Sequence, residues 1–280
     1  MNKKYIPVFL IVFFLTCYAL RITDSLLLRT DQGPIGELFT HKLLGIVLLA
    51  TALFFLRMKW ADIGFKFDQF PRGILTGLAI GGSAYITAFV AEIVVAAIQG
   101  KSPSLQFYVT NYDLLGNAVL GNSTLFVLIC ITGNIINVIM ENGVFSGLMI
   151  TVGKKRHSFF IANGFYSSFL FGLWHSVMPL RNFIDGNMPL SSALFAALML
   201  FFSSFIFSIQ TGMQYERAGS LWDGMVVHFM NNASANLFHV VFQDGTESTP
   251  IMRIAIAQII MFIIVTVRWF IWKKAKQNGT

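Results

Sequence analysis

Charged side chains are scarce in this chain. Asp, Glu, Lys and Arg make up only 12% of its 280 residues, and 55% of the residues are hydrophobic. Soluble domains carry about 25% charged residues. The low charge and the positive mean hydropathy of +0.68 therefore predict an all-α, polytopic membrane protein. Cysteine is also rare: Cys17 and Cys130 both lie in apolar runs, which excludes a disulfide framework and a CxxC metal site.

Two further absences bear on the class of function. The net charge is +7, but the basic residues form no patch, so we expect no nucleic-acid partner. The chain has no sustained heptad, low-complexity tract or internal repeat, which gives no support to an inverted-repeat transporter.

Long apolar segments fill most of the chain, and most reach the roughly 20 residues that a spanning helix needs. We expect about eight transmembrane helices, at 5–21, 39–57, 73–98, 123–152, 158–180, 190–214, 220–242 and 250–272. We expect a single integral membrane domain over 1–280. The charged, aromatic stretch 58–72 is predicted to be a cytoplasmic interfacial linker, and 99–122 an outer loop with a short surface helix.

The basic residues predict the orientation. If the N-terminus is cytoplasmic, 14 of them fall on the inner side and 6 on the outer side, as the positive-inside rule requires. The outer six are Arg21, Arg29, Lys42, Lys101, Arg181 and Arg253. We therefore predict a multi-pass protein of the cell membrane with both termini in the cytoplasm and the lipid bilayer around it.

The seventh segment carries an unusual polar stripe. His228, Asn232, Asn236 and His239 are spaced four, four and three residues apart, so on a helix they share one face. An unpaired polar group in lipid costs several kcal/mol, so this face must look into protein or trapped water. His228 and Asn232 present two donors to one point, as an oxyanion site requires.

Polar groups also interrupt three other segments. Asn137 and Glu141 lie on one face of the fourth segment with Asn134, and a buried glutamate of this kind can serve as a general base. In the fifth segment, Phe171 lies one turn before His175, where its ring can hold the imidazole. Glu92 in the third segment reads more simply as a structural hydrogen-bonding group, either paired with a neighbouring helix or protonated.

If these polar groups converge in the fold, they can form a hydrolytic site. Glu141 and His175 could activate one water, while His228 and Asn232 stabilise the developing oxyanion. By the predicted boundaries the residues lie near mid-membrane or toward its cytoplasmic half, with His175 nearer the outer end. A shared cavity open to the cytosol would support hydrolysis.

The order Glu, FxxxH and GSLW followed by HxxxN resembles the CAAX prenyl endopeptidase and bacteriocin-processing (CPBP or Abi) family of intramembrane glutamate proteases. The resemblance covers about 141–232, with Tyr215, Arg217, Trp222, His228 and Asn232 in family positions, and includes the ADIGF sequence of the linker. It implies a bundle of about eight helices in which Glu141 and His175 activate water and His228 and Asn232 hold the oxyanion.

The chain departs from the family in one motif. The family's EExxxR reads ENGVFS here, so Glu141 is kept while Asn142 and Ser146 replace an acid and an arginine. The replaced positions are four apart, suited to an ion pair on a helix, and losing both together leaves no stranded charge. The change fits either a compensated swap around an intact catalytic glutamate or a protein drifting to a non-catalytic role.

We expect no cofactor. One Glu and two His residues could bind zinc, but HExxH is absent and Asn232 suits an oxyanion better than a metal.

Three functions stay open from the sequence. The first is an endopeptidase cutting a membrane-associated peptide or protein. The second is a degenerate family member acting as a scaffold, chaperone or bacteriocin self-immunity protein with a membrane-protein partner. The third is a small-solute carrier that uses Glu92 and the asparagine stripes as a polar path.

Overall fold

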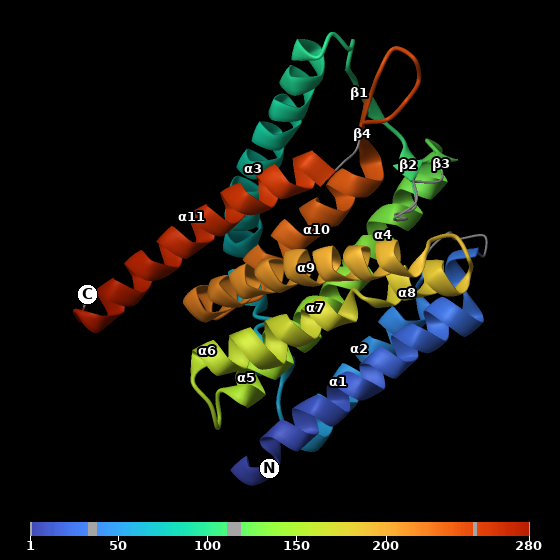
Figure 1. The fold of residues 1–280 in the computed structure, drawn as a ribbon. Helices are drawn as coiled ribbons and strands as arrows, with labels where there is room; N and C mark the ends of the chain where they lie inside the picture. The colour runs from blue at the N-terminus through green and yellow to red at the C-terminus, as the bar shows by residue number, and fades with distance from the viewer. Residues whose placement is uncertain (1, 33–37, 111–118, 249–250, 280) are drawn as a thin grey trace.

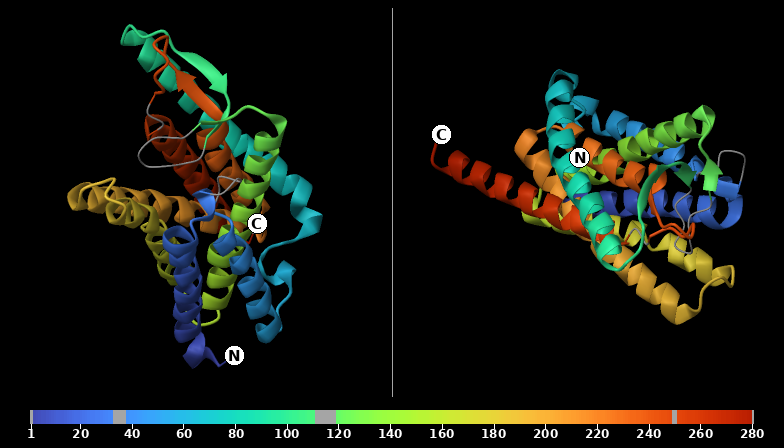
Figure 2. Two further views of the ribbon diagram at one scale, coloured as in Figure 1. Left: turned by 90° about the vertical axis from the view of Figure 1, so that its right-hand side faces the viewer. Right: turned by 90° about the horizontal axis from the view of Figure 1, so that it is seen from above.

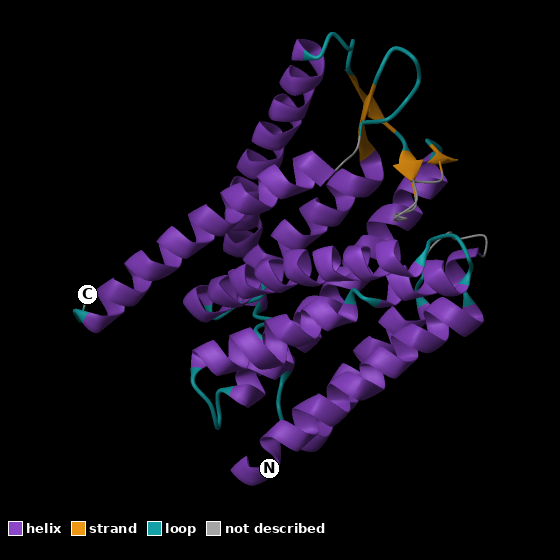
Figure 3. Ribbon diagram, viewed as in Figure 1, coloured by secondary structure: helices purple, strands orange, loops and turns teal. Residues whose placement is uncertain are grey.

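The computed structural model describes residues 2–32, 38–110, 119–248 and 251–279. It is an all-α bundle with two small strand pairs at one end (Figures 1 and 3). The helices are α1 (Ile6–Ile22), α2 (Thr40–Leu56), α3 (Phe70–Ile98), α4 (Thr124–Glu141), α5 (Ile150–Gly153), α6 (Phe159–Ile161), α7 (Leu170–Trp174), α8 (Val177–Ile184), α9 (Leu190–Ala218), α10 (Trp222–Leu237) and α11 (Ile251–Gln277).

Three helices contain wider π turns: η2 (Thr23–Leu28) extends α1, η6 (Asn142–Met149) joins α4 to α5, and η7 (Ala162–Phe169) joins α6 to α7. The short 3₁₀ turns are η1 (Lys3–Tyr5), η3 (Thr30–Gln32), η4 (Trp60–Ile63) and η5 (Phe67–Gln69).

Each of the eight predicted apolar segments contains helix in the described residues. Five helical stretches there are long and apolar enough to cross a membrane: Lys3–Leu28, Phe67–Ile98, Thr124–Gly153, Leu190–Ala218 and Ile251–Gln277. Thr40–Leu56 is apolar but shorter. The membrane-type helical bundle is thus confirmed, while the count of eight spans stays a prediction.

Helix packing follows the apolar faces. α3 packs mainly against α10 and α11, and α9 packs against η7, α7, α8 and α11. Large apolar side chains such as Phe54, Phe55, Leu194 and Phe195 stay exposed on the outer surface of the bundle. This is the surface that lipid covers in a membrane protein.

The loop predicted over 99–122 is partly extended chain. β1 (Ser104–Phe107) pairs antiparallel with β4 (Phe238–Val241), with Phe107 opposite Phe238. β2 (Val109–Thr110) pairs with β3 (Val119–Gly121). The predicted short surface helix has no counterpart among the described residues of this loop, and 111–118 lie outside them.

The predicted linker folds over the turn between α9 and α10. Ile63 is fully buried, Leu221 N–H donates to the Gly64 carbonyl at 3.0 Å, and Trp222 Nε1–H donates to the Lys66 carbonyl at 2.7 Å. A Cβ added to Gly147 would come within 2.9 Å of the Ile63 carbonyl oxygen, so the linker backbone lies directly against η6. The last three residues of the predicted linker, 70–72, already belong to α3.

The bundle has two distinct ends: in Figure 1 both chain termini lie toward the left and bottom, and the strands and α8 lie toward the right, while Figure 2 gives two further views. The basic end holds the N-terminal residues, the linker, the turn at 154–158 and the C-terminal tail. There Arg156 donates to the carbonyls of Lys3 and Lys4, and Lys154 pairs with Glu216. The strand end holds the strands, the turn after α1 and the loop between α8 and α9.

Candidate active site

A cavity of about 580 Å³ lies within the bundle, and all four predicted catalytic residues line it. Glu141 comes from the end of α4, His175 follows α7, and His228 and Asn232 project from α10. Three segments far apart in the sequence thus meet around one space.

Glu141 is 3% exposed, and its two carboxylate oxygens have different partners. Oε1 accepts a hydrogen bond from Trp174 Nε1–H at 2.7 Å and lies 3.5 Å from Arg21 Nη1. Oε2 lies 3.5 Å from His228 Nε2. Oε1 is therefore held in place, while Oε2 faces the histidine.

The helix changes geometry directly after Glu141. From Asn142 the turns are π turns, in which the hydrogen bond closes one residue later than in an α-helix. Residues four apart then no longer stand one above the other. Asn142 accordingly contacts His228, whereas Ser146 Oγ lies 3.2 Å from Thr211 Oγ1. The two positions that replace the family's acid and arginine thus bond to different helices.

His175 is oriented by its own helix. Nδ1 lies 2.9 Å from the Phe171 carbonyl oxygen, and the two rings pack edge to face with centroids 4.6 Å apart. A carbonyl oxygen only accepts, so Nδ1 carries the proton and Nε2 keeps the lone pair that a general base needs. The expected contact between Phe171 and His175 is present.

His228 is 4% exposed and bonded on both sides. Nδ1 lies 2.8 Å from Asn142 Oδ1, Nε2 faces Glu141, and the Phe207 ring packs at 4.9 Å. Asn142 has both an amide donor and an amide acceptor, so it can support either neutral tautomer of the imidazole. The tautomer with Nε2–H, which an oxyanion site requires, forms when the amide group turns its NH₂ toward Nδ1.

The polar stripe on α10 ends earlier than predicted. Asn232 and Asn236 both line the cavity, and Asn236 Nδ2–H donates to the Thr110 carbonyl at 3.0 Å. The helix stops at Leu237, so His239 lies in β4. There it stacks on Tyr108 at 4.0 Å and bonds Glu247 at 2.7 Å. The prediction that His239 shares the helix face is wrong, because the chain leaves the helix to pair with β1.

The other predicted supporting residues divide into two groups. Asn137 and Phe171 line the cavity. Ser146, Arg217 and Trp222 are not among its described lining residues. Arg217 pairs with the buried Asp223 at 3.1 Å, and Trp222 packs edge to face on Phe70 with ring centroids 4.8 Å apart. These contacts fix the start of α10 against the linker, so they act on His228 and Asn232 through the helix.

Arg21 is the main site residue that the sequence reasoning missed. It counted as an outer-side charge, yet it is 9% exposed, pairs with Glu141 and lies over the Trp174 ring at 4.6 Å. Arg21 thus supplies Glu141 with a positive charge from α1, whereas α4 and η6 contain no basic residue. The available signal was its position at the end of an apolar run, followed three residues later by Asp24.

A second missed pair lies next to Trp174. His41 Nδ1 is 2.8 Å from Asp24 Oδ2, both side chains are 1% exposed, and the His41 ring lies 5.6 Å from Trp174. His41 also lines the cavity. The Asp24–His41 pair therefore helps fix the indole that donates to Glu141.

Glu92 lies outside this cavity lining. It pairs with Arg253 at 3.2 Å, and both side chains are buried. The structure thus gives Glu92 the paired, structural setting expected of it and places Arg253 inside the bundle rather than in an outer loop. In the described residues, no three His, Cys, Asp or Glu side chains are grouped closely enough to hold a metal ion.

The sequence pattern and the geometry point to the same relatives. A family model described as type II CAAX prenyl endopeptidase Rce1-like matches residues 123–234. The match covers less than half of the chain, so it shows a likeness to that family over this segment. The matched segment includes all four lining residues discussed first, but not Arg21 or His41. No curated protein and no solved structure matches the chain. The chain is thus similar to CAAX-protease-like proteins over 123–234, and its long apolar helices are of the membrane-spanning type.

Proposed function

We propose that this chain is a membrane-embedded glutamate endopeptidase that hydrolyses a peptide bond of a membrane-associated peptide or protein without a metal. The observation that carries this proposal is the single cavity shared by Glu141, His175, His228 and Asn232. We further propose that the chain resides in the cell membrane with both termini in the cytoplasm.

In this mechanism a water sits between Glu141 Oε2 and His175 Nε2. One of these bases takes a proton as the water oxygen attacks the peptide carbonyl carbon. The carbonyl oxygen becomes an oxyanion and accepts hydrogen bonds from Asn232 Nδ2–H and His228 Nε2–H. The proton then passes to the leaving amine as the C–N bond breaks, which yields a free carboxylate and a free amine.

The surroundings of Glu141 support its part in the mechanism. Trp174 and Arg21 hold Oε1, so only Oε2 is left to meet water. A carboxylate held in one orientation needs little reorganisation when it takes the proton. Buried rings, including Phe171 and Phe207, surround the histidines and limit water to the cavity.

The test compares new protein N-termini in membranes from cells that express either the parent or Glu141→Gln. Glutamine keeps the size of the side chain and an oxygen that can accept from Trp174, but it cannot serve as a base. We expect a set of N-termini present with the parent and missing with Glu141→Gln. Identical sets would refute the hydrolase. Copurification of the same membrane-protein partner with both forms would then favour the scaffold or immunity role.

A further inference from the structure

The cavity extends from the middle of the bundle toward the strand end. Its lining on α9 lies between Leu200 and Phe207, around the middle of that helix, and its lining on α11 is Ile254 and Gln258, near the first residues of that helix. On α4 the lining ends at Glu141. On α10 the described lining runs from His228 to Asn236, from the middle of the helix to its strand end.

The exposed rim of the cavity is at the strand end as well. Gln32 and Asn187 are exposed, and Leu38, Lys42 and Asp185 are half-buried. The described lining includes no residue of the linker, the turn at 154–158 or the basic tail. The described rim of the cavity is therefore at the strand end, opposite the N-terminal residues.

Packed apolar side chains close the way toward the basic end. Phe145, Leu148 and Met149 of η6 are at most 2% exposed, and Ile63 of the linker and Leu221 before α10 are equally buried. The linker backbone lies against Gly147 on this side. Water and a peptide can therefore reach Glu141 from the strand end and not through the basic end.

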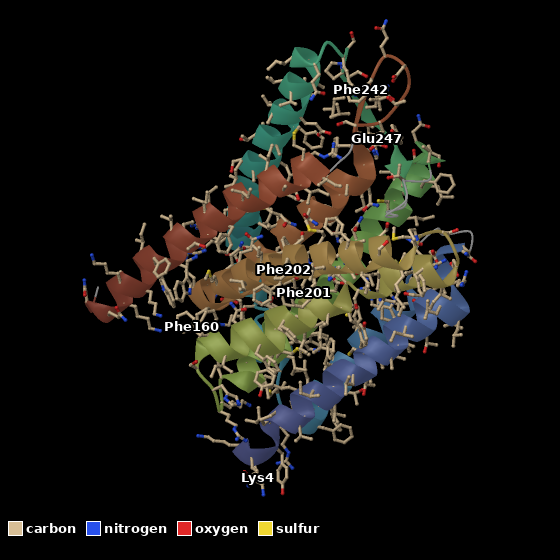
Figure 4. The ribbon with its side chains drawn as sticks, viewed as in Figure 1. Lys4, Phe160, Phe201, Phe202, Phe242 and Glu247 are labelled. Atoms are coloured by element: carbon tan, nitrogen blue, oxygen red, sulfur yellow. The ribbon has the colours of Figure 1, made fainter. Side chains whose placement is uncertain are left out.

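The basic residues decide which end is cytoplasmic. Figure 4 shows Lys4 at the basic end and Phe242 and Glu247 at the strand end. Of the six basic residues assigned to the strand end, Arg21 and Arg253 are buried in pairs with glutamates.

Two more of the six form ion pairs with aspartates. Arg29 donates two hydrogen bonds to Asp185 at 2.6 and 3.1 Å, and Arg181 donates to Asp31 at 2.7 Å. Basic residues are paired at the other end too, as Lys154–Glu216 and Arg217–Asp223 show, so the orientation rests on the count of 14 basic residues assigned to the basic end against 6. The positive-inside rule then puts the basic end in the cytoplasm.

From these observations we propose that the reaction centre is open to the non-cytoplasmic side and takes its substrate there. This inference rests on the proposed function in calling the bound polypeptide a substrate. The direction of access does not depend on that function. The substrate class is an extended polypeptide segment at the outer membrane face, either an exported peptide or the outer flank of a membrane-anchored protein. A protein held at the cytoplasmic face by a lipid anchor cannot bring its scissile bond to this opening.

Sided thiol labelling tests the direction of access. Asn187→Cys places a thiol on the rim, and Lys155→Cys places one on the exposed turn at the basic end. The parent is the background, because Cys17 and Cys130 are both buried. With a membrane-impermeant maleimide on intact cells, we expect Asn187→Cys to be labelled as fully before permeabilisation as after it. Lys155→Cys should be labelled only after permeabilisation, and the reverse pattern would overturn the proposal.

A third variant tests the cavity itself. Ala235 is 7% exposed and lines the cavity beyond Asn232, away from the basic end. Ala235→Cys should react with a small, charged methanethiosulfonate reagent added outside intact cells, and reaction only from the cytoplasmic side would overturn the proposal. Labelling requires no catalysis, so it tests the direction of access alone. If no Glu141-dependent N-termini are found but Ala235→Cys is labelled from outside, the proposed hydrolase is refuted and the proposed direction of access is supported.

Discussion

Asn142 gives the sharpest prediction about the departure from the family motif. Its amide lies 2.8 Å from Nδ1 of His228, and both residues are about 4% exposed. Asn142→Leu keeps nearly the same side-chain volume but leaves the buried Nδ1 without its hydrogen-bond partner. An unsatisfied buried polar group costs about 1–3 kcal/mol. If that energy is lost in the transition state, kcat falls roughly 5- to 150-fold, since about 1.4 kcal/mol corresponds to a factor of ten.

The assay is the rate at which the Glu141-dependent N-termini form in purified, reconstituted protein, measured together with the melting temperature. Ser146→Ala is the matched control, because Ser146 lies in the same π turns but contacts Thr211 instead. We expect Ser146→Ala to keep nearly the parental rate. If Asn142→Leu keeps the parental rate at an unchanged melting temperature, then Asn142 does not orient His228 for catalysis.

Three further predictions concern charged pairs. Arg21→Gln removes a hydrogen bond between charged groups at Glu141 worth about 1.5–3 kcal/mol, so kcat should fall roughly 10- to 150-fold with little change in KM. Arg21→Lys should restore part of the lost kcat. A change in KM alone would contradict a role of Arg21 in holding Glu141 for catalysis. Replacing either partner of the buried Glu92–Arg253 pair by Met should lower the free energy of unfolding by about 3–5 kcal/mol, because the other charge is left buried and unpaired. Replacing both partners should lower it by much less. Equal losses in the single and double variants would show that the two residues are not energetically coupled. Arg29 holds the pKa of Asp185 below its ordinary value of 3.8, so the carboxylate's stabilisation is fully present above about pH 5 and is lost as the pH falls through the lowered pKa. The difference in melting temperature between the parent and Asp185→Asn should follow that course, and a difference that persists at lower pH would contradict it.

The sequence predicted the helices well because burial in lipid demands long apolar runs. Every predicted apolar segment contains a helix, and the seventh, 220–242, runs past the end of α10 at Leu237 and takes in His239. There the chain leaves the helix because Phe238 and its neighbours pair with β1, more than 130 residues earlier in the chain. Such a pairing has no local signal. The π turns after Glu141 were equally hidden, since a shift of one residue in hydrogen bonding leaves the apolar pattern nearly unchanged.

The candidate site was predictable where polar groups interrupt apolar helices, as at Glu141 and His228. Arg21 escaped because an arginine near the end of an apolar segment resembles one that reaches the membrane surface. Only the fold shows that it turns inward to Glu141 and Trp174. Asn142 and Ser146 read as a lost ion pair, and the structure instead gives each of them a partner on another helix.

The central claim is that Glu141, across the shared cavity from His175, activates water for peptide hydrolysis. The most direct measurement is the incorporation of ¹⁸O from labelled water into the new carboxyl terminus of a processed substrate, in membranes of the parent and of Glu141→Gln. We predict one ¹⁸O atom per cleavage in the parent and a yield lower by about a hundredfold or more in Glu141→Gln. Equal yields from the two proteins would contradict the account.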